Sequence, residues 1–221
     1  MNKYIPINVP RGTHYGSNYY YTYSFKLKRY VKLYSQLEYH NFLTLEMNPL
    51  VETFCEQPLE IKIIVNEKEE SSIFDMWVLY TNHKEEFQEV KYMSEINDSN
   101  NPPNRAIHQI EKQKLWCDNN RFNYNIRTDQ DIYKGPYYIN NLRFIHGTII
   151  RCKFELMEEY LQNILQLVGK ERISILELSN MIKIAHISLI NVIAYGIYVG
   201  KLEADLLTAP VSYDTYIWIK I

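Results

Sequence analysis

Residues 73–92 read IFDMWVLYTNHKEEFQEVKY, and this stretch decides the fold of the first part of the chain. Two runs rich in β-branched and aromatic residues flank the polar tetrapeptide TNHK, a pattern that predicts a β-hairpin. Side chains two positions apart in a strand share a face, so Glu89 and Lys91 should point the same way, with Asp75 on the partner strand. The hairpin is therefore expected to bring two carboxylates and one ammonium group together.

Such a set suits the hydrolysis of phosphodiesters. Carboxylate oxygens bind Mg²⁺, for which Mn²⁺ can substitute, and a bound metal neutralises a phosphate and acidifies a water. A lysine can orient that water and stabilise developing charge. Because ExK patterns are common in charged strands, a surface hairpin with a cross-strand ion pair is the alternative. Asp75 favours the site, since it is the lone charge in an apolar run and a buried carboxylate needs a cation or a metal.

A third acid, Glu38, comes from a separate segment. Residues 33–47 are predicted to form a helix that stops at Asn48-Pro49. At helical spacing Glu38 shares one stripe with Tyr34, Phe42 and Leu45. An acid on an apolar stripe that faces a sheet is unusual for a solvated charge, so Glu38 is expected to belong to the same site.

Other candidate sites are weaker. Glu46 and Glu52 lack such a context and are interpreted as surface groups. His40 projects from another side of the helix and is interpreted as structural. The six histidines show no HExxH pair, no GxSxG occurs, and neither GxxxxGK[ST] nor GxGxxG is present among the seven glycines. Zinc-protease, serine-hydrolase and nucleotide-hydrolase chemistry are therefore disfavoured.

Composition bounds the setting in which the protein works. The formal net charge of −2 is not that of a stand-alone duplex-binding protein, so any contact with DNA should be local or helped by a partner. The three cysteines, Cys55, Cys117 and Cys152, have no CxxC spacing and are expected to be reduced thiols. No apolar signal region and no run of membrane-spanning length is visible, which predicts a cytoplasmic protein without membrane contact.

The order of the predicted elements indicates two domains. The first, 1–148, begins with a tyrosine-rich arm and continues as an α/β (α+β) unit, a mixed sheet flanked by helices. The second, 149–221, has three helices closed by a strand and is predicted to be a small winged-helix domain. The predicted strands are 51–56, 60–65, 73–80, 86–92, 122–128 and 211–219; the predicted helices are 33–47, 106–117, 152–168, 174–182 and 187–199, and 97–104 is a polar turn.

Taken in order, these motifs resemble TnsA, the endonuclease subunit of the heteromeric transposase of certain bacterial cut-and-paste transposons. TnsA belongs to the PD-(D/E)xK nuclease superfamily. The resemblance covers about residues 23–145 well and the tail more loosely, and its specificity lies in the ordered series rather than in any single motif. The matching residues are 24–29, 34–38, 43–49, Val51, 56–58, 74–75, 89–91, 128–132 and 141–142.

The resemblance implies a restriction-endonuclease-like fold and a metal-dependent DNA endonuclease that cleaves the 5′ strands at the transposon ends. Two departures from the pattern leave every required group in place: Phe74 stands where the superfamily often has proline, and Glu89 where some relatives carry glutamine. The roles it implies are catalytic for Glu38, Asp75, Glu89 and Lys91, and metal-binding for Glu38, Asp75, Glu89 and the carbonyl of Val90.

The resemblance also implies partners. These are the double-stranded DNA of transposon ends, a DDE-type transposase subunit that cuts and joins the 3′ ends, and an AAA+ ATPase regulator that contacts the carboxy-terminal region. Residues 149–221 are expected to dock on a protein rather than read DNA, because the predicted helix 187–199 contains no Arg or Lys. Two alternatives stay open, namely a stand-alone restriction or repair nuclease and a non-catalytic subunit that assembles the transposition complex.

Overall fold

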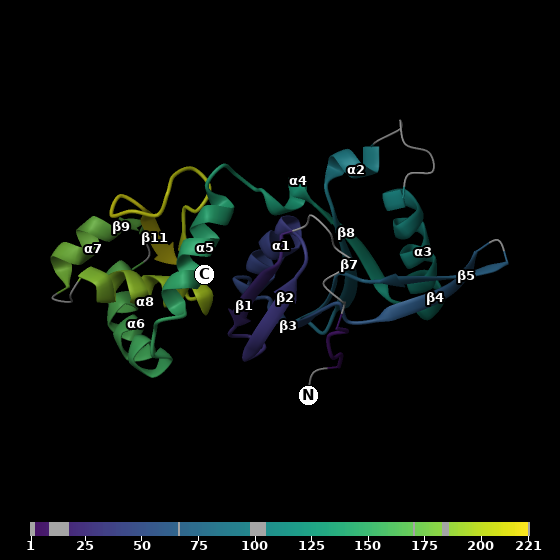
Figure 1. Cartoon of the computed structure of the whole chain (residues 1–221). Coiled ribbons are helices and arrows are strands. Elements are labelled where there is room, and N and C mark those ends of the chain that lie inside the picture. The colour runs from purple at the N-terminus through teal and green to yellow at the C-terminus, as the bar shows by residue number, and fades with distance from the viewer. Residues whose placement is uncertain are drawn as a thin grey trace. The chain divides into compact units, whose positions relative to one another are not determined.

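The computed structural model describes residues 3–8, 18–65, 67–97, 105–169, 171–182 and 186–220, and the predicted turn at 97–104 lies almost wholly outside them. The chain divides by its contacts into two compact units, one of residues 1–46 and 50–132, the other of residues 47–49 and 133–221 (Figure 1). The domain boundary predicted from the sequence lies after residue 148. The helix over 138–149 belongs to the second unit, because it packs on the helix over 186–198.

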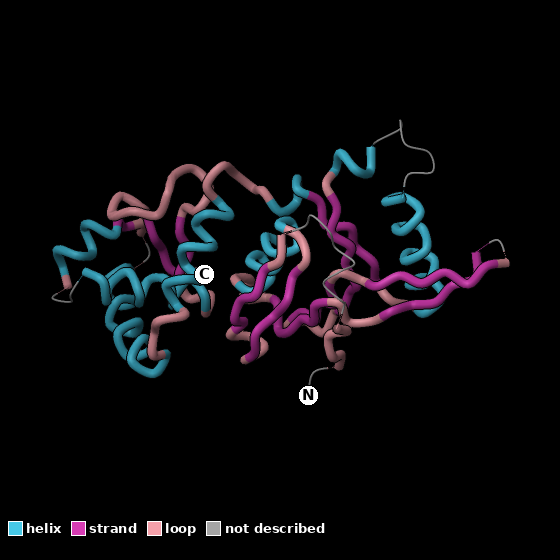
Figure 2. Tube along the Cα trace, in the orientation of Figure 1, coloured by secondary structure: helices cyan, strands magenta, loops and turns pink. Residues whose placement is uncertain are grey.

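The first unit is a mixed sheet with helices on both faces (Figures 1 and 2). Its central strands run in the order β3-β6-β7-β8, antiparallel except for the parallel pair β7 and β8. Two antiparallel hairpins, β1-β2 and β4-β5, accompany it. The elements are β1 Tyr20–Ser24, β2 Arg29–Leu33, α1 Gln36–Glu46, β3 Val51–Glu56, β4 Glu60–Val65, β5 Lys68–Ile73, β6 Met76–Tyr80, β7 Glu85–Lys91, α2 Met93–Asn97, α3 Arg105–Asn120, β8 Asn123–Thr128 and α4 Asp129–Ile132.

Helices α1 and α3 cover opposite faces of β7. Gln88 of this strand accepts a hydrogen bond from Asn41 of α1, at 2.9 Å. The next residue, Glu89, accepts one from Gln113 of α3, at 2.8 Å. Since successive side chains of a strand point to opposite faces, the two helices lie on the two sides of the sheet. The α3 side holds an aromatic core around Phe87.

The predicted hairpin is confirmed with a shorter first strand. The turn forms where the sequence places it, with the N–H of Tyr80 donating to the Lys84 carbonyl at 2.8 Å and His83 at a positive φ of 64°. The predicted strand 73–80 is wrong at its start, because Ile73 ends β5 and Met76 begins β6. The chain passes at this point from the β4-β5 hairpin into the central sheet.

The interpretation of Glu46 as a surface group is wrong. Its side chain is completely buried and accepts hydrogen bonds from the Ser24 hydroxyl at 2.6 Å and from the N–H of Phe25 at 2.8 Å. The carboxylate ties the turn of the β1-β2 hairpin to the end of α1. Glu52 is exposed as expected, and His40 is buried within α1.

The second unit packs helices around a small antiparallel sheet of order β10-β11-β9. An amphipathic helix forms where the sequence predicts one from 152 to 168, and its apolar stripe meets the neighbouring helix across Gly196, where a Cβ would lie 2.9 Å from Leu161. The sequence analysis does not predict the helix over 138–149. The elements are α5 Tyr138–Ile149, α6 Phe154–Val168, β9 Ile173–Ser174, α7 Ile175–Met181, α8 His186–Tyr198, β10 Leu202–Ala204 and β11 Tyr216–Ile219.

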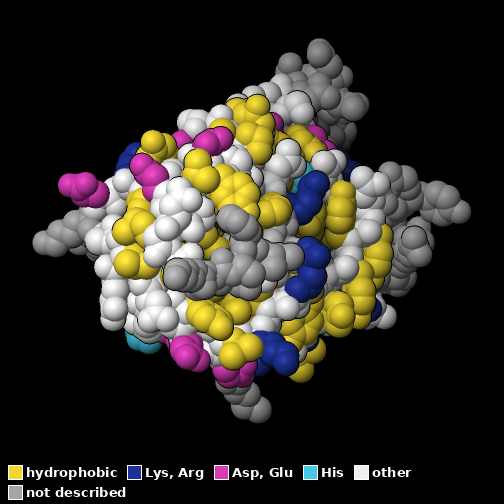
Figure 3. Space-filling model, turned by 90° about the vertical axis from the view of Figure 1, so that its left-hand side faces the viewer, with side chains coloured by type: hydrophobic (Ala, Val, Ile, Leu, Met, Phe, Trp, Pro, Cys, Tyr) yellow, Lys and Arg dark blue, Asp and Glu magenta, His cyan; other side chains and the backbone are white. Residues whose placement is uncertain are grey.

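Two features bear on the partners of the chain. Among the residues that the structure describes, no helix has the length and apolar character needed to cross a membrane. The second unit exposes many large apolar side chains, and they spread over much of the face in Figure 3, which views the chain from the side where α7 lies in Figure 1. Examples are Leu156, Leu167, Leu176 and Met181.

Candidate active site

Asp75 stands at the open end of the β6-β7 ladder. The last residue pair of this ladder is Met76 with Gln88. One step further, the carboxylate of Asp75 accepts a hydrogen bond from the N–H of Val90, at 2.8 Å. The Asp75 side chain thus replaces the backbone hydrogen bond that would come next in the ladder. Its main-chain carbonyl accepts from the N–H of Gln57, at 3.0 Å, which fixes the position of Asp75 against the end of β3.

Glu89 and Lys91 share a face of β7, as the strand pattern predicts. The Lys91 ammonium donates to Glu89 Oε1 at 2.6 Å. The Glu89 side chain is completely buried, whereas that of Lys91 is 19% exposed. The second carboxylate oxygen of Glu89 accepts from Gln113 at 2.8 Å. Both oxygens of the acid are therefore held, one from the strand and one from α3.

Glu38 lies on α1, on the other side of the sheet from Gln113, and is near enough to Asp75 for the two charges to interact. It lies in the first turn of α1 and is only 8% exposed. One of its oxygens, Oε2, accepts from the N–H of Tyr34 at 3.1 Å and from Gln57 Nε2 at 3.2 Å. Its own N–H donates to the Ser35 hydroxyl at 3.1 Å, an N-terminal cap of the helix. The acidic side chain is thus held by the segment that leads into its helix.

The charges of the four groups act on one another. Burial and then repulsion from Asp75 raise the pKa of Glu38 and of Glu89 to about 8, from a usual value of 4.5. Burial lowers the pKa of Lys91, but attraction to Asp75 and Glu89 outweighs burial and leaves that pKa raised. The lysine therefore stays charged at neutral pH, while a good part of each glutamate is protonated. The charge of Asp75 is the one that acts on all three of the other groups.

Two glutamines that the sequence analysis did not single out for a role complete this arrangement. Gln57 bridges Glu38 and Asp75 with its side chain and its backbone, and it has a positive φ of 37°, a conformation that non-glycine residues adopt at a cost. Gln113 is completely buried and also binds Ser72 and Tyr124. Helical spacing was the signal for Gln113, because it lies on the stripe of α3 that its buried neighbours Ile110 and Cys117 define.

The carboxylates of Glu38, Asp75 and Glu89 are the candidate ligands for a divalent cation. Across the described ranges, no three His, Cys, Asp or Glu side chains are grouped so that they could hold a metal ion. Glu38 and Glu89 instead turn toward their hydrogen-bond donors. Mg²⁺, however, takes one or two carboxylates and fills its remaining positions with water and phosphate oxygens. Asp75 with one glutamate fits that demand, whereas a cage of three carboxylates does not match this conformation.

The comparisons with known proteins agree with this architecture. Residues 48–129 match the family model described as TnsA-like endonuclease N terminal. The match covers β3 to β8 and so includes Asp75, Glu89 and Lys91, while Glu38 lies ahead of it. No curated protein matches the chain. The mixed sheet flanked by helices is consistent with a restriction-endonuclease-like fold. Residues 48–129 are thus similar to the N-terminal domain of TnsA-like endonucleases.

Proposed function

We propose that this protein is a Mg²⁺-dependent DNA endonuclease that cuts the 5′ strands at transposon ends. The observation that carries the proposal is the position of Asp75 beside Val90 at the end of the β6-β7 ladder, next to the buried pair Glu89 and Lys91, within the region that resembles the TnsA-like family. Glu38, which precedes that region, is close enough for its pKa to be raised by Asp75. Acids whose pKa is raised by burial and by a like charge are typical of functional sites. Such an arrangement lowers the stability of the fold, so it is usually kept for a function.

The proposed roles follow from the geometry. Asp75 and Glu89 would hold the cation, and a bound cation would neutralise the scissile phosphate and make a water molecule more acidic. The N–H of Val90 points to Asp75, and in a strand the N–H and C=O of one residue face the same edge, which supports the Val90 carbonyl as a further ligand. Lys91 orients the attacking water and stabilises charge on the phosphate. Glu38 completes the acidic set from the other face.

A cleavage assay on labelled transposon-end DNA with Mg²⁺ or Mn²⁺ tests the proposal. Asp75→Asn removes the charge and keeps an acceptor for Val90, so it should fold normally and cut about a hundredfold or more slowly. Lys91→Ala should lose activity to a similar extent. Lys62→Ala, which removes an exposed ion-paired lysine of β4, is the matched control and should cut at the wild-type rate. Equal cleavage by all three variants would refute the assignment.

The second unit is proposed to dock on partner proteins. Its exposed apolar side chains support a protein surface rather than a DNA surface, since nucleic acid demands a cationic, polar face. The proposed partners are a DDE-type transposase subunit, which cuts the 3′ strands, and an AAA+ ATPase regulator. Cleavage that needs these proteins would favour transposition, whereas full activity of the chain alone would favour a stand-alone nuclease.

A further inference from the structure

The N-terminal segment has a charge that differs sharply from the rest of the chain. Residues 1–37 contain six Lys and Arg and no Asp or Glu, whereas the whole chain has a formal net charge of −2. The remaining 184 residues therefore carry −8. The first acid in the sequence is Glu38, the acid of the candidate site. A basic segment thus leads directly into that site in an otherwise acidic protein.

The β1-β2 hairpin divides these basic residues into two groups. Arg29 and Lys26 are engaged inside the unit, Arg29 by two 2.6 Å hydrogen bonds to Glu56 and Lys26 by one of 2.7 Å to the Val51 carbonyl. Lys28, in the hairpin turn, and Lys32 are exposed. Neither forms an ion pair with an acid in the part of the chain that the structure describes. Their two charges are available to an anion from outside.

The same face of the hairpin exposes stacked tyrosines. Tyr21 pairs across the strands with Lys32, and Tyr23 pairs with Tyr30. The rings of Tyr21 and Tyr30 stack with centroids 4.7 Å apart and planes at 7°, although 59% and 55% of these residues are exposed. The opposite face is apolar, with Val31 completely buried. The structure therefore holds two flat rings together at the surface, near two exposed lysines that form no ion pair within the described residues; Lys32 makes only a long hydrogen bond of 3.5 Å to the neutral amide of Asn8.

We infer that this hairpin face binds a DNA strand with unpaired bases next to the cleavage site, a step that rests on the proposed nuclease function. Aromatic rings at a protein surface stack readily on bases that are unpaired, and lysines attract the phosphates that link them. The hairpin is tied to the site by the chain itself, because β2 ends at Leu33 and the N–H of the next residue, Tyr34, bonds Glu38. The strand held on the hairpin would continue toward the acids.

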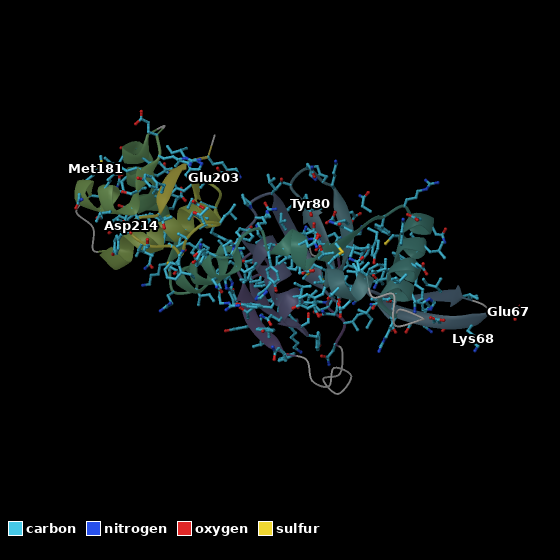
Figure 4. All side chains as sticks on the ribbon, turned by 90° about the horizontal axis from the view of Figure 1, so that it is seen from above. Glu67, Lys68, Tyr80, Met181, Glu203 and Asp214 are labelled. Carbon is cyan, nitrogen blue, oxygen red and sulfur yellow. The ribbon has the colours of Figure 1, made fainter. Side chains whose placement is uncertain are left out.

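The test measures binding by the full chain in metal-free buffer, so that no cleavage occurs. Fluorescence anisotropy follows three labelled DNAs: a single strand, a duplex with a single-stranded extension, and a blunt duplex. One variant combines Tyr21→Ala with Tyr30→Ala, and a second combines Lys28→Ala with Lys32→Ala. The control combines Lys62→Ala with Lys68→Ala on the β4-β5 hairpin; Lys68 lies at the outer tip of that hairpin (Figure 4).

The tyrosine variant should bind the single strand and the extended duplex at least about fivefold more weakly, because each lost base stack weakens binding by that factor or more. Its affinity for the blunt duplex should stay within about twofold. The lysine variant should weaken binding to all three DNAs and lower the salt dependence, the slope of log Kd against log salt, by about 1.4 to 1.8. The control should match the wild type, and Tyr→Phe changes at both positions should retain binding.

Three results would overturn the inference: unchanged binding of unpaired DNA by the tyrosine variant, an equal loss for blunt duplex, or an equal loss in the control. Thermal unfolding of each variant separates binding from folding, and the Tyr→Phe pair keeps the test decisive if the alanines destabilise the hairpin. Cleavage is scored separately. A wild type that binds as expected but never cuts would refute only the nuclease proposal, and a wild type that cuts while the hairpin variants bind normally would refute only this inference.

Discussion

Gln113→Leu should destabilise the protein by about 2–4 kcal/mol. The wild-type side chain donates to Glu89 at 2.8 Å and accepts from the Tyr124 hydroxyl at 2.8 Å, with no exposure to water. Leucine is of similar volume and removes both of these hydrogen bonds, together with those that Gln113 donates to the Ser72 hydroxyl at 3.0 Å and to the Ile73 carbonyl at 3.2 Å. A hydrogen bond contributes about 1 kcal/mol between neutral groups and about 1.5–3 kcal/mol to a charged group, so the bond to Glu89 contributes most when that acid is ionised. The Glu89 side chain is completely buried and cannot turn to water instead.

Urea unfolding measures this loss as a lower midpoint at an unchanged slope. Gln162→Leu is the matched control, because Gln162 makes an exposed bond of 2.8 Å to Glu158 and should change stability by less than about 0.5 kcal/mol. Adding Tyr124→Phe to Gln113→Leu removes the orphaned hydroxyl and should restore roughly 1 kcal/mol. If Gln113→Leu is as stable as the wild type, or if Tyr124→Phe deepens its loss, Gln113 does not hold Glu89 in the way the hydrogen bonds indicate.

Three further results are expected. Glu46→Gln should cost about 1–3 kcal/mol in urea unfolding, because a buried acceptor of three hydrogen bonds becomes partly a donor, while Glu52→Gln at the surface should be neutral. Without metal, the free energy of unfolding should fall as pH rises from about 5 to 8, because the raised pKa values of Glu38 and Glu89 make the folded state hold protons that the unfolded state has lost. Added Mg²⁺ should reduce that fall. A free energy of unfolding that does not change with pH would contradict the raised pKa values. Leu176→Asp, at an exposed position of α7, should weaken capture of the ATPase regulator in a pull-down without changing the melting temperature, and full capture would argue against docking through α7.

Several strands of the first unit could be predicted because each of them carries a local signal. The strand over 51–56 and the one over 60–65 are confirmed at both ends, since β-branched and aromatic runs end there at turn residues. The β1-β2 hairpin and β5 were missed for physical reasons. Residues 20–24 consist of three tyrosines with Thr22 and Ser24, and half of residues 68–73 are charged, so neither segment shows the alternation of apolar and polar residues that marks a half-buried strand.

The candidate site was predictable in composition but not in its contacts. Strand alternation places Glu89 with Lys91, as found. The burial of Glu46 could not be predicted, because it follows from hydrogen bonds to the β1-β2 turn, about twenty residues earlier in the chain, rather than from the pattern of its own helix. The role of Gln57 follows likewise from contacts with Glu38 and Asp75, which are distant in sequence, so no local pattern could reveal it.

Asp75 is part of the architecture as well as of the proposed chemistry, because its carboxylate receives the Val90 N–H where the strand ladder stops. Mutational libraries could separate these two duties at a single codon. Selection for protein abundance alone should retain asparagine at this position and deplete alanine, since only asparagine keeps an acceptor for the amide. Selection for transposition should deplete both. A codon that tolerates asparagine under the first selection and only aspartate under the second marks a residue that evolution holds for two independent reasons.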